Sequence, residues 1–479
     1  MNILWPVKDL DKGNNQFLGI MTISGLLEKH GHHSEVVEAE YGAVAAKLRK
    51  GDFAIVAFST MSLYCQSYLQ LNRRLKKSFP VLSVFGGPHP TYFPEMIHQQ
   101  GVDGVCIGEG EYAMLDLVQN LSVGKAITDI PNWWVKKDER IHKNAVRPLI
   151  DDLDELPIPN HELFRSAVPR GIWRAVIMTS RGCPHSCTYC YNSAYKNIYA
   201  GRGRILRRRS VENVIRELET IKRHACYKYI QISDDLFTIS PEWIREFSDQ
   251  YGKKIKLPFS CFARVNHITQ EMVDDLKRAG CGRIIVGVET GDERIRRDVF
   301  KRKMTDQEII MTARMIKKAG IKLMTTNILG IPGASLESDY QTWALNVKLK
   351  PDYAGVNLLQ PYPGTEIHEY ARKLDLIASE IGEGEIREAM LSSVIKFPNE
   401  TEKRKAENFE KFFPVVVAFP MMLPLVKRLI LLPQNRAFNL VLSLWTNYCY
   451  CCRIIPFRIG IVALWKKIPF RRLTRRFCL

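Results

Sequence analysis

Three closely spaced cysteines constrain this chain more than any other feature of its sequence. Cys183, Cys187 and Cys190 are separated by three and then two residues, so their thiolates fall on one short loop. Three such thiolates can hold three irons of a [4Fe-4S] cube and leave the fourth iron without a protein ligand. The spacing therefore predicts a cluster whose open iron binds a small molecule. Zinc is the alternative metal, with His185 or a distant cysteine as its fourth ligand.

The cysteine spacing is similar to the signature of the radical S-adenosylmethionine (SAM) enzymes. The resemblance implies that the cluster passes one electron to SAM, which is cleaved to methionine and a 5′-deoxyadenosyl radical. It also implies that Tyr189, just before the third cysteine, lies beside the adenine of SAM.

Length and composition indicate a globular chain of two or three domains. The 479 residues are 46% hydrophobic and 25% charged, which is ordinary for folded proteins. The first nine residues lack a basic stretch followed by a long apolar run, so we expect no secretory signal and a cytoplasmic location. Twelve cysteines in a chain of this length fit a reducing compartment better than a disulfide scaffold.

The positive charge of the chain is concentrated at one end. Of the net charge of +18, residues 411–479 supply twelve Lys or Arg side chains and no Asp or Glu. The remaining residues are only mildly basic, and no recognisable RNA-binding pattern accompanies the charge. We therefore expect no nucleic-acid partner.

Residues 1–125 alternate apolar strands with amphipathic helices, which is typical of an α/β domain. One helix is expected from about Phe17 to Gly31. Strands are expected at residues 2–7, 36–37, 53–58, 81–85 and 102–107. The pattern predicts a doubly wound, Rossmann-like parallel sheet within a domain of residues 1–135. Ligands of such sheets bind at the carboxyl ends of the strands.

Small and polar residues follow three of these predicted strands. They are Ser59, Thr60, Gly86, Gly87, Gly108 and Glu109. Small residues let a large ligand approach the backbone. The region resembles the cobalamin-binding domain that precedes the radical SAM core in one branch of that superfamily, and the resemblance assigns cobalamin to these six residues. A plain flavodoxin-like module with a regulatory or vestigial role is the alternative.

Methionine-synthase-type cobalamin domains carry a histidine below the cobalt, in a loop after the first strand. Here that loop, residues 9–16, contains no histidine. The resemblance therefore implies a cobalamin without a protein imidazole. We expect the other histidines of this region to be surface or loop residues rather than cobalt ligands; they are His30, His32, His33 and His89.

We expect residues 136–168 to form a linker, because residues 151–160 are acidic and contain two prolines. Six predicted strands then alternate with helices over residues 169–375, which predicts a partial (β/α)6 TIM-like barrel. The strands are expected at residues 175–179, 229–233, 259–265, 283–288, 322–329 and 353–359, and helices at 210–224, 269–279, 305–319 and 337–349. The chemistry of such barrels lies at the carboxyl ends of the strands, and the cysteine loop follows the first strand.

Charged residues and glycines follow the later barrel strands in order. We expect Asp234 and Asp235 to accept hydrogen bonds from the SAM amino group and Arg264 to pair with its carboxylate. Glu289 is expected to hold the ribose, and Gly330 would let the backbone approach the adenine or the substrate. Singly, each has a structural alternative, such as a helix cap or a surface ion pair. Together they resemble the cobalamin-binding radical SAM family over residues 1–375.

The C-terminal region, residues 376–479, is basic and mostly helical by prediction. Its apolar blocks contain Trp445 and Trp465, but no uncharged run reaches the ~20 residues of a spanning helix. Apolar blocks with only positive charge suit peripheral contact with anionic lipid at the inner face of a membrane. A helical cap packed on the barrel is the alternative. Three crowded cysteines in this region fit buried thiols or acylation better than a second cluster; they are Cys449, Cys451 and Cys452.

These patterns together predict a radical SAM enzyme that uses a [4Fe-4S] cluster, SAM and cobalamin. The most specific hypothesis is methylation of an unactivated carbon in a small molecule, lipid or lipid-linked substrate, with flavodoxin or ferredoxin as electron donor. The alternatives are a radical rearrangement, cyclisation or carbon–carbon bond formation without methyl transfer, and a non-catalytic binding protein. The sequence identifies no catalytic residue, substrate or oligomeric state.

Overall fold

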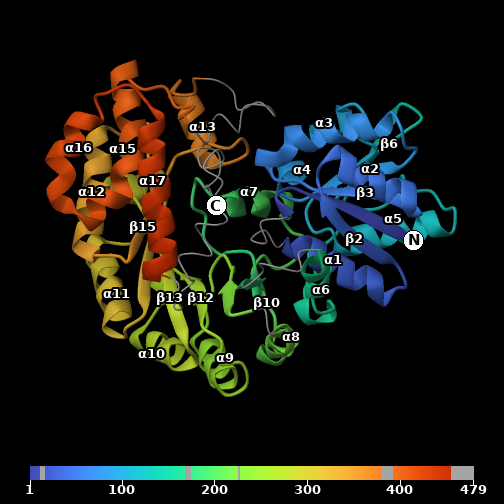
Figure 1. Ribbon diagram of the computed structural model, residues 1–479, viewed down its shortest axis with the longest axis horizontal. Coiled ribbons are helices and arrows are strands. Elements are labelled where there is room, and N and C mark those ends of the chain that lie inside the picture. Colours follow the sequence, from blue (N-terminus) through green and yellow to red (C-terminus); the bar gives the residue numbers. More distant parts are fainter. Residues whose placement is uncertain (11–16, 168–173, 225–226, 379–391, 455–479) are drawn as a thin grey trace. The chain divides into compact units, whose positions relative to one another are not determined.

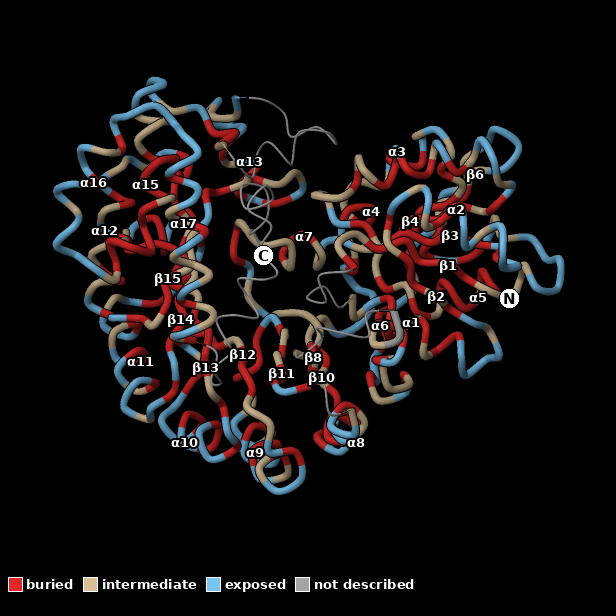
Figure 2. The backbone as a smooth tube through the Cα atoms, viewed as in Figure 1, coloured by how far each residue is buried: buried red, intermediate tan, exposed pale blue. Residues whose placement is uncertain are grey.

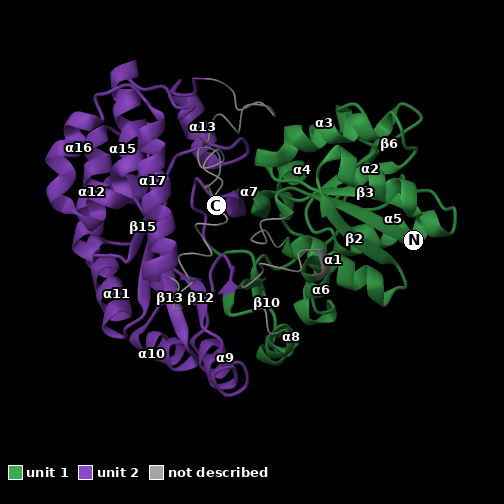
Figure 3. Cartoon of the chain, in the orientation of Figure 1, with its two compact units in different colours: residues 1–184, 194–230 green, residues 185–193, 231–479 purple. Residues whose placement is uncertain are grey.

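The structure is a computed structural model that describes all residues except 11–16, 168–173, 225–226, 379–391 and 455–479. The loop over residues 9–16 therefore lies largely outside the described residues, and Trp465 lies wholly outside them. The chain forms two compact units, which are coloured separately in Figure 3. Unit 1 contains residues 1–184 and 194–230, and unit 2 contains residues 185–193 and 231–479. The domain boundaries inferred from the sequence stay predictions.

Unit 1 is built on a seven-stranded sheet with the order β2-β1-β3-β4-β5-β6-β7. The strands are β1 Asn2–Val7, β2 His33–Glu38, β3 Phe53–Ser59, β4 Leu82–Gly86, β5 Gly104–Cys106, β6 Trp133–Lys137 and β7 Arg140–Lys143. Neighbours among β1 to β5 pair in parallel, which confirms the predicted Rossmann-like sheet. Strands β6 and β7 extend it with antiparallel pairing, an addition that the sequence did not predict.

Helices cover both faces of this sheet because its central strands are apolar along their whole length. The helices are α1 Leu18–Lys29, α2 Tyr41–Lys50, α3 Cys65–Lys76, α4 Pro88–Tyr92 and α5 Glu111–Ser122. Helices α2 and α3 pack together on one side of the sheet, and α1 and α5 pack together on the other (Figure 1). The core includes the stacked rings of Phe58 and Phe85, whose centroids lie 4.6 Å apart. Burial runs along most of β1 and through the central residues of β3 and β4 in Figure 2.

A buried ion-pair group lies in the later part of unit 1. This part contains α6 His161–Ala167, β9 Ser180–Arg181, β10 Arg207–Arg208 and α8 Val211–Arg223. Glu217 on α8 is fully buried; its Oε1 lies 2.7 Å from His161 Nε2, and its other oxygen accepts a hydrogen bond from Arg209. Two basic partners hold the pKa of Glu217 below its usual value despite the burial, which by itself raises it.

A second, six-stranded sheet has the order β15-β14-β13-β12-β11-β8. Its strands are β8 Arg174–Ile177, β11 Tyr229–Ile232, β12 Phe259–Ala263, β13 Cys281–Glu289, β14 Lys322–Leu329 and β15 Tyr353–Leu358. From β12 to β15 each strand pairs in parallel with the next, as the predicted (β/α)6 barrel requires. Helices line the outer side of the sheet in Figure 1; they are α9 Pro241–Lys254, α10 Gln270–Ala279, α11 Asp306–Lys318 and α12 Leu336–Leu349.

The C-terminal region is helical, as predicted. Its helices are α13 Glu366–Lys373, α15 Glu400–Ala418, α16 Leu423–Leu429 and α17 Arg436–Tyr448. Phe409, Phe413 and Val416 of α15 are buried in one apolar cluster with Leu329 and Leu358 of the sheet. Helix α15 therefore acts as a cap on the sheet, which was one of the two alternatives for this region. Within the described part of the chain, no helix is long and apolar enough to cross a membrane.

Candidate active site

The three cysteines lie on the loop between β9 and α7 (Tyr191–Ile198). The amide of Cys190 donates to the carbonyl of Cys187 at 3.0 Å, which closes the second half of the loop into a turn. Gly182 precedes Cys183 with a φ of +81°, and a Cβ there would lie 2.2 Å from the carbonyl oxygen of Ile205. Only glycine fits this position, because a side chain would meet both backbone strain and a clash. None of the three thiols takes part in a disulfide.

The thiol of Cys187 faces two guanidinium groups. Arg264 follows β12, and its Nη1 lies 3.4 Å from Cys187 Sγ. Arg302 follows the turn after β13, and its Nη1 lies 3.8 Å from the same sulfur. Arg302 also donates to the hydroxyl oxygen of Tyr189 at 3.0 Å and to the carbonyl of Gly287 at 2.5 Å. The three groups that the Arg302 guanidinium contacts belong to the cysteine loop or to the carboxyl-terminal half of β13.

Tyr189 and Glu289 are buried together beside this arginine. The Tyr189 ring packs edge-on against Phe300, with centroids 4.7 Å apart. Burial raises the pKa of Tyr189 and also that of Glu289, whose carboxyl hydrogen-bonds the Tyr189 hydroxyl. The Thr326 hydroxyl donates to Glu289 Oε1 at 3.3 Å. Glu289 has a φ of +64°, an unusual backbone conformation for a non-glycine residue and one that concentrates at functional sites.

The two predicted aspartates follow β11 but differ in exposure. Asp234 is buried, whereas Asp235 is exposed and its carboxylate hydrogen-bonds the side chain of Asn192, next to Cys190. Gly330, after β14, has a φ of +67° and donates its amide to the carboxyl of Asp339 at 3.3 Å. Burial raises the pKa of Asp339 to about 7. Tyr189, Arg264 and Glu289 thus gather at Cys187, and Asp235 lies at the end of the cysteine loop.

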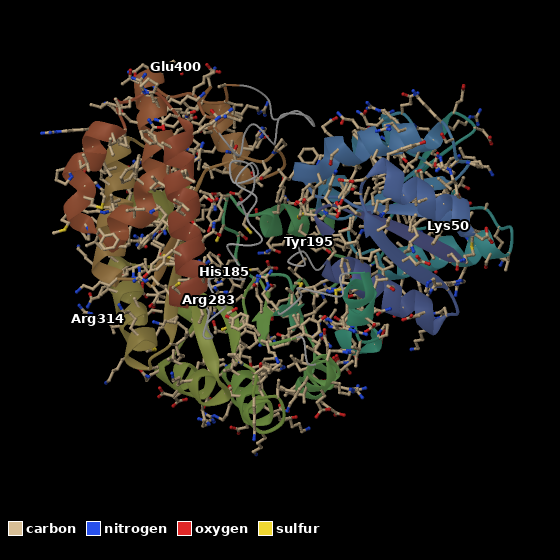
Figure 4. All side chains as sticks on the ribbon, viewed as in Figure 1. Lys50, His185, Tyr195, Arg283, Arg314 and Glu400 are labelled. Atoms are coloured by element: carbon tan, nitrogen blue, oxygen red, sulfur yellow. The ribbon has the colours of Figure 1, made fainter. Side chains whose placement is uncertain are left out.

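The cysteine loop offers thiolate ligands and cationic neighbours, a donor set that suits an anionic iron–sulfur cluster. Among the residues that the structure describes, no group of three or more His, Cys, Asp or Glu side chains is arranged to hold a metal ion. His185, labelled in Figure 4, instead pairs with His267, with 2.9 Å between their Nε2 atoms. The identity of the metal therefore depends on the chemistry of the loop and on the relatives described below.

In unit 1, four of the six residues predicted to bind cobalamin come together at the ends of β3 and β4. Ser59 pairs in register with Gly86. The Thr60 amide donates to the Gly86 carbonyl at 2.7 Å, and a Cβ at Gly87 would lie 3.0 Å from the Thr60 nitrogen. The glycines let the ends of β3 and β4 approach each other closely, at the carboxyl edge of the sheet where ligands of such sheets bind. The residues present therefore fit a cobalamin at this edge.

His89 lies at the same edge, and its placement corrects the expectation of a surface or loop histidine. It is 1% exposed within α4, with its Nδ1 2.9 Å from the Ser62 hydroxyl. Its Nε2 is buried and has no hydrogen-bond partner among the described residues. Because buried polar atoms are nearly always paired, this atom is the strongest indication of an absent polar ligand group here.

The other two predicted residues follow β5. Gly108 donates its amide to the Thr91 hydroxyl at 3.0 Å, which joins its loop to α4. The Glu109 carboxylate is engaged by Arg181 at 2.9 Å and Arg207 at 2.8 Å, so this side chain is committed to ion pairs within unit 1. Those two arginines hold its pKa below the usual value against the raising effect of burial.

Sequence reasoning missed Arg302 and His89. Arg302 lies within a run of three basic residues, 301–303, which is typical of a solvated surface, yet its side chain is buried. His89 follows the glycine pair after β4, and a histidine in a predicted ligand-binding loop was the available signal. The individual cofactor-binding roles of the predicted residues stay predictions.

A partial barrel with a cysteine loop, preceded in the chain by a Rossmann-like domain, defines the class of cobalamin-dependent radical SAM enzymes. Residues 12–118 match the sequence model of the B12 binding domain, and residues 177–341 match that of the radical SAM superfamily. The two matches together span more than half of the chain. The chain belongs to the cobalamin-binding radical SAM family, which confirms the predicted cofactors: a [4Fe-4S] cluster, SAM and cobalamin.

Curated relatives carry more than one activity in their names. An uncharacterized methyltransferase of Pyrococcus horikoshii is 29% identical, over 74% of this chain and 78% of the relative. The anaerobic magnesium-protoporphyrin IX monomethyl ester cyclase of Synechocystis is 24% identical, over 64% and 63%. The hopanoid C-3 methylase of Methylococcus capsulatus is 24% identical, over 74% and 69%.

Solved structures share the fold. The cobalamin-dependent SAM radical enzyme OxsB matches with a TM-score of 0.71 and 15% identity, over 94% of this chain and 71% of that chain. The radical SAM methyltransferase TsrM of Kitasatospora setae matches with a TM-score of 0.64 and 15% identity, over 80% and 76%. These likenesses confirm the predicted architecture, and at this identity they carry no information on the substrate.

Proposed function

We propose that this chain is a SAM- and cobalamin-dependent methylase that acts on an unactivated carbon of a lipid or lipid-linked substrate. The observation that carries the methylase proposal is the order of the two domains, B12-binding and then radical SAM, in one chain. When bound, the cluster and SAM supply a carbon-centred radical, and cobalamin carries a methyl group. A chain with both cofactors has the means to remove a hydrogen atom from carbon and to replace it with methyl.

The chain's own residues would bind and orient these groups. Cys183, Cys187 and Cys190 would hold three irons, as their spacing predicts. The buried Glu289 carboxyl would accept hydrogen bonds from the SAM ribose, and Asp235 would accept from its amino group. Ser59, Thr60, Gly86, Gly87 and Gly108 would line the cobalamin, and Glu109 would contribute its backbone, since its carboxylate is paired with Arg181 and Arg207.

Burial around the cysteine loop supports radical chemistry. Cys187, Arg264, Arg302 and Glu289 are each less than a tenth exposed, so the side chains around the Cys187 sulfur are shielded from water. Exclusion of water protects reactive intermediates from side reactions and strengthens local electrostatic interactions. A site buried in this way suits a carbon radical better than it suits hydrolysis.

Two relatives support methyl transfer by name, the methyltransferase of Pyrococcus horikoshii and the hopanoid methylase of Methylococcus capsulatus. The cyclase of Synechocystis supports the runner-up, a radical cyclisation without methyl transfer. We favour methylation because cobalamin has a defined role in it, whereas radical SAM chemistry alone suffices for many rearrangements.

The C-terminal surface supports a lipid or lipid-linked substrate. Nine of the thirteen exposed large apolar side chains among the described residues fall within residues 419–448. Three of them, Leu440, Leu444 and Tyr448, recur at every fourth residue of α17 and so lie along one stripe of that helix. Residues 411–454 carry five Lys or Arg side chains and no Asp or Glu. An exposed apolar stripe with only positive charge nearby suits an anionic lipid surface.

Methyl transfer is tested by the products of SAM. The reconstituted protein is loaded with hydroxocobalamin, its absorbance spectrum is recorded, and it is incubated anaerobically with SAM and a reductant. We expect S-adenosylhomocysteine to form in proportion to bound cobalamin, and no S-adenosylhomocysteine from protein without cobalamin. If 5′-deoxyadenosine forms and S-adenosylhomocysteine does not, methylation is excluded and the runner-up chemistry is favoured.

A further inference from the structure

Arg264 and Arg302 converge on a single sulfur atom. Their Nη1 atoms lie 3.4 Å and 3.8 Å from Cys187 Sγ, and the two arginines come from different strand ends of the barrel. All three side chains are buried: Cys187 is 6% exposed, Arg264 9% and Arg302 6%. The other guanidinium contacts of Arg302 are to neutral groups, the hydroxyl of Tyr189 and the carbonyl of Gly287.

Among the described residues neither arginine has a carboxylate oxygen within 4.0 Å, although the charge of Glu289 acts on both guanidinium groups. The Nε of each is buried and lacks a hydrogen-bond partner in the same part of the chain. This arrangement differs from that of the neighbouring Arg296, which is fully buried and bonds to Asp306 at 2.6 Å and to the carbonyls of Thr290 and Met304.

Two buried guanidinium groups without a carboxylate in direct contact are costly unless further negative charge lies nearby. The Cys187 sulfur is the shared group that both face, and as a thiolate ligand of an iron–sulfur cluster it belongs to an anion. Reduction of the cluster adds one further negative charge. A fixed cation near a ligand sulfur stabilises the reduced form more than the oxidised form, and hydrogen bonds to the sulfurs act in the same direction.

Arg302 is held firmly enough to act in this way. Its amide donates to the carbonyl of Arg296 at 2.8 Å, and its side chain spans from the cysteine loop to the end of β13. Gly287 makes room for it, because a Cβ at that position would lie 3.1 Å from Arg302 Nη2 and 2.3 Å from Glu289 Oε1. Arg264 approaches the same sulfur from the end of β12.

We propose that Arg264 and Arg302 are positioning residues that raise the reduction potential of the cluster through the Cys187 thiolate, so that a weak cellular electron donor can reduce it. This inference rests on one part of the proposed function, the presence of a cluster on the cysteine loop, and does not require methyl transfer. It gives Arg264 a different role from the pairing with the SAM carboxylate that the sequence predicts. It adds Arg302, which no sequence motif identified.

The test is a redox titration of the reconstituted, full-length protein, followed by electron paramagnetic resonance of the reduced cluster. The charge is removed in Arg264→Gln and Arg302→Gln and kept in Arg264→Lys and Arg302→Lys. Arg314→Gln, an exposed position on α11 that is labelled in Figure 4, removes one charge far along the chain from the cysteine loop and serves as the control. Iron and sulfide content are measured for each variant before titration.

We expect each glutamine variant to bind as much iron as the parent and to show a midpoint potential lower by about 59 mV or more. This shift equals a tenfold fall in the ratio of reduced to oxidised cluster at a fixed potential. The lysine variants and Arg314→Gln should remain within twofold of the parent ratio. The second arginine keeps the proposal testable if one glutamine variant fails to fold.

The proposal is overturned if both glutamine variants hold the cluster and keep the parent potential. For Arg264 alone, the proposal is also overturned if Arg264→Gln lowers the affinity for SAM but leaves the midpoint potential of the cluster, measured without SAM, unchanged. That result would assign Arg264 to the SAM carboxylate. Failure of the parent protein to bind any cluster would instead count against the proposed function.

Discussion

Gly108 adopts a backbone conformation that favours glycine and lies against a tyrosine. Its φ is +79°, and a Cβ there would lie 1.8 Å from the Tyr199 hydroxyl oxygen. The Tyr199 hydroxyl oxygen accepts a hydrogen bond from the Glu109 amide at 2.9 Å, in the same loop. The tyrosine therefore cannot move aside without losing that bond. This residue illustrates how a position predicted to contact a cofactor is also required by the local packing.

Gly108→Ala is expected to lower the free energy of unfolding by more than about 2 kcal/mol, since positive φ alone costs 1–2 kcal/mol for a residue with a Cβ and the clash adds to it. Gly124→Ala is the matched control, because Gly124 has a φ of +68° and nothing within 4 Å of its Cβ position. Urea unfolding of both variants measures the difference. Equal losses in the two variants would show that the Tyr199 contact contributes nothing.

The burial of His89 predicts how the free energy of unfolding depends on pH. Burial lowers the pKa of His89 to about 4, from 6.5 for an exposed histidine. Between these values the unfolded chain binds one more proton than the folded chain, so the stabilising effect of a neutral His89 is present above pH 6.5 and is lost as the pH falls toward 4. The loss is at most about 3 kcal/mol.

Urea unfolding of the full-length chain at several pH values between 7.5 and 5 tests this prediction. We expect the parent to lose more stability than His89→Asn over this interval, because asparagine does not titrate. A variant whose stability falls with pH as steeply as that of the parent would contradict the burial of a neutral imidazole.

At the residue scale, the sequence indicated which residues belong to the candidate site better than it indicated the contacts that those residues make. Cys183, Cys187 and Cys190 were identified by spacing alone, and Glu289 by its place at a strand end. Arg264 was also predicted as a site residue, but its contact with the Cys187 sulfur was not. Arg302 reaches the same sulfur from the turn after β13. Such a convergence depends on contacts between residues far apart in the chain, which a local pattern does not encode.

At the scale of elements, helix α11 shows how a local signal sets a boundary. Thr305 caps the helix: its hydroxyl accepts from the Glu308 amide at 3.2 Å, and the Glu308 carboxylate accepts from the Thr305 amide at 2.6 Å. This reciprocal capping box satisfies backbone amides that have no partner inside the helix. The helix predicted at residues 305–319 accordingly begins where the sequence places it.

Thr305→Ala is expected to lower the free energy of unfolding by about 1 kcal/mol, the usual cost of a lost cap. Ser335→Ala is the matched control, because Ser335 stands at the N-cap of α12 and makes no side-chain capping bond there. Thermal or urea unfolding compares the two variants. If Ser335→Ala lowers the free energy of unfolding as much as Thr305→Ala does, the loss cannot be assigned to the capping hydrogen bonds of Thr305.

Strand prediction succeeded where strands are apolar along their length. Strands β1 and β3 were predicted to within a residue at each end, since buried parallel strands are mostly apolar runs. Strand β14 was predicted equally well, although Thr325, Thr326 and Asn327 interrupt its apolar residues. Strands β6 and β7 were missed because they are only five and four residues long and each contains two basic Lys or Arg side chains. Strand β6 joins the sheet by antiparallel pairing with β5, a contact that a local pattern does not predict. Helix α9 was also missed.

At the scale of the whole molecule, the uneven distribution of charge leads to a prediction about membranes. The segment from residue 411 to the end carries twelve basic and no acidic side chains, and the exposed apolar stripe of α17 lies within it. Electrostatic attraction brings such a segment to anionic lipid, and apolar side chains then insert at the interface. Salt should weaken the first step because it screens the charges.

We expect the full-length protein to float with vesicles that contain phosphatidylglycerol and to float less with pure phosphatidylcholine vesicles. Replacing Leu440, Leu444 and Tyr448 with serine should lower the bound fraction at least fivefold. The double variant of Val123 and Met311 to serine, which removes exposed apolar side chains elsewhere, is the control. Unchanged flotation of the triple variant would exclude the α17 stripe as the lipid-binding surface.

The most direct test of the central claim is the cleavage of SAM by the anaerobically reconstituted protein. With iron, sulfide and a reductant supplied, the parent is expected to convert SAM to 5′-deoxyadenosine, and Cys187→Ala is expected to form none above background, since it removes one of the three predicted cluster ligands. Product is quantified by chromatography and mass spectrometry. If the parent forms no 5′-deoxyadenosine, or if Cys187→Ala forms as much as the parent, this chain does not use the cysteine loop for radical SAM chemistry.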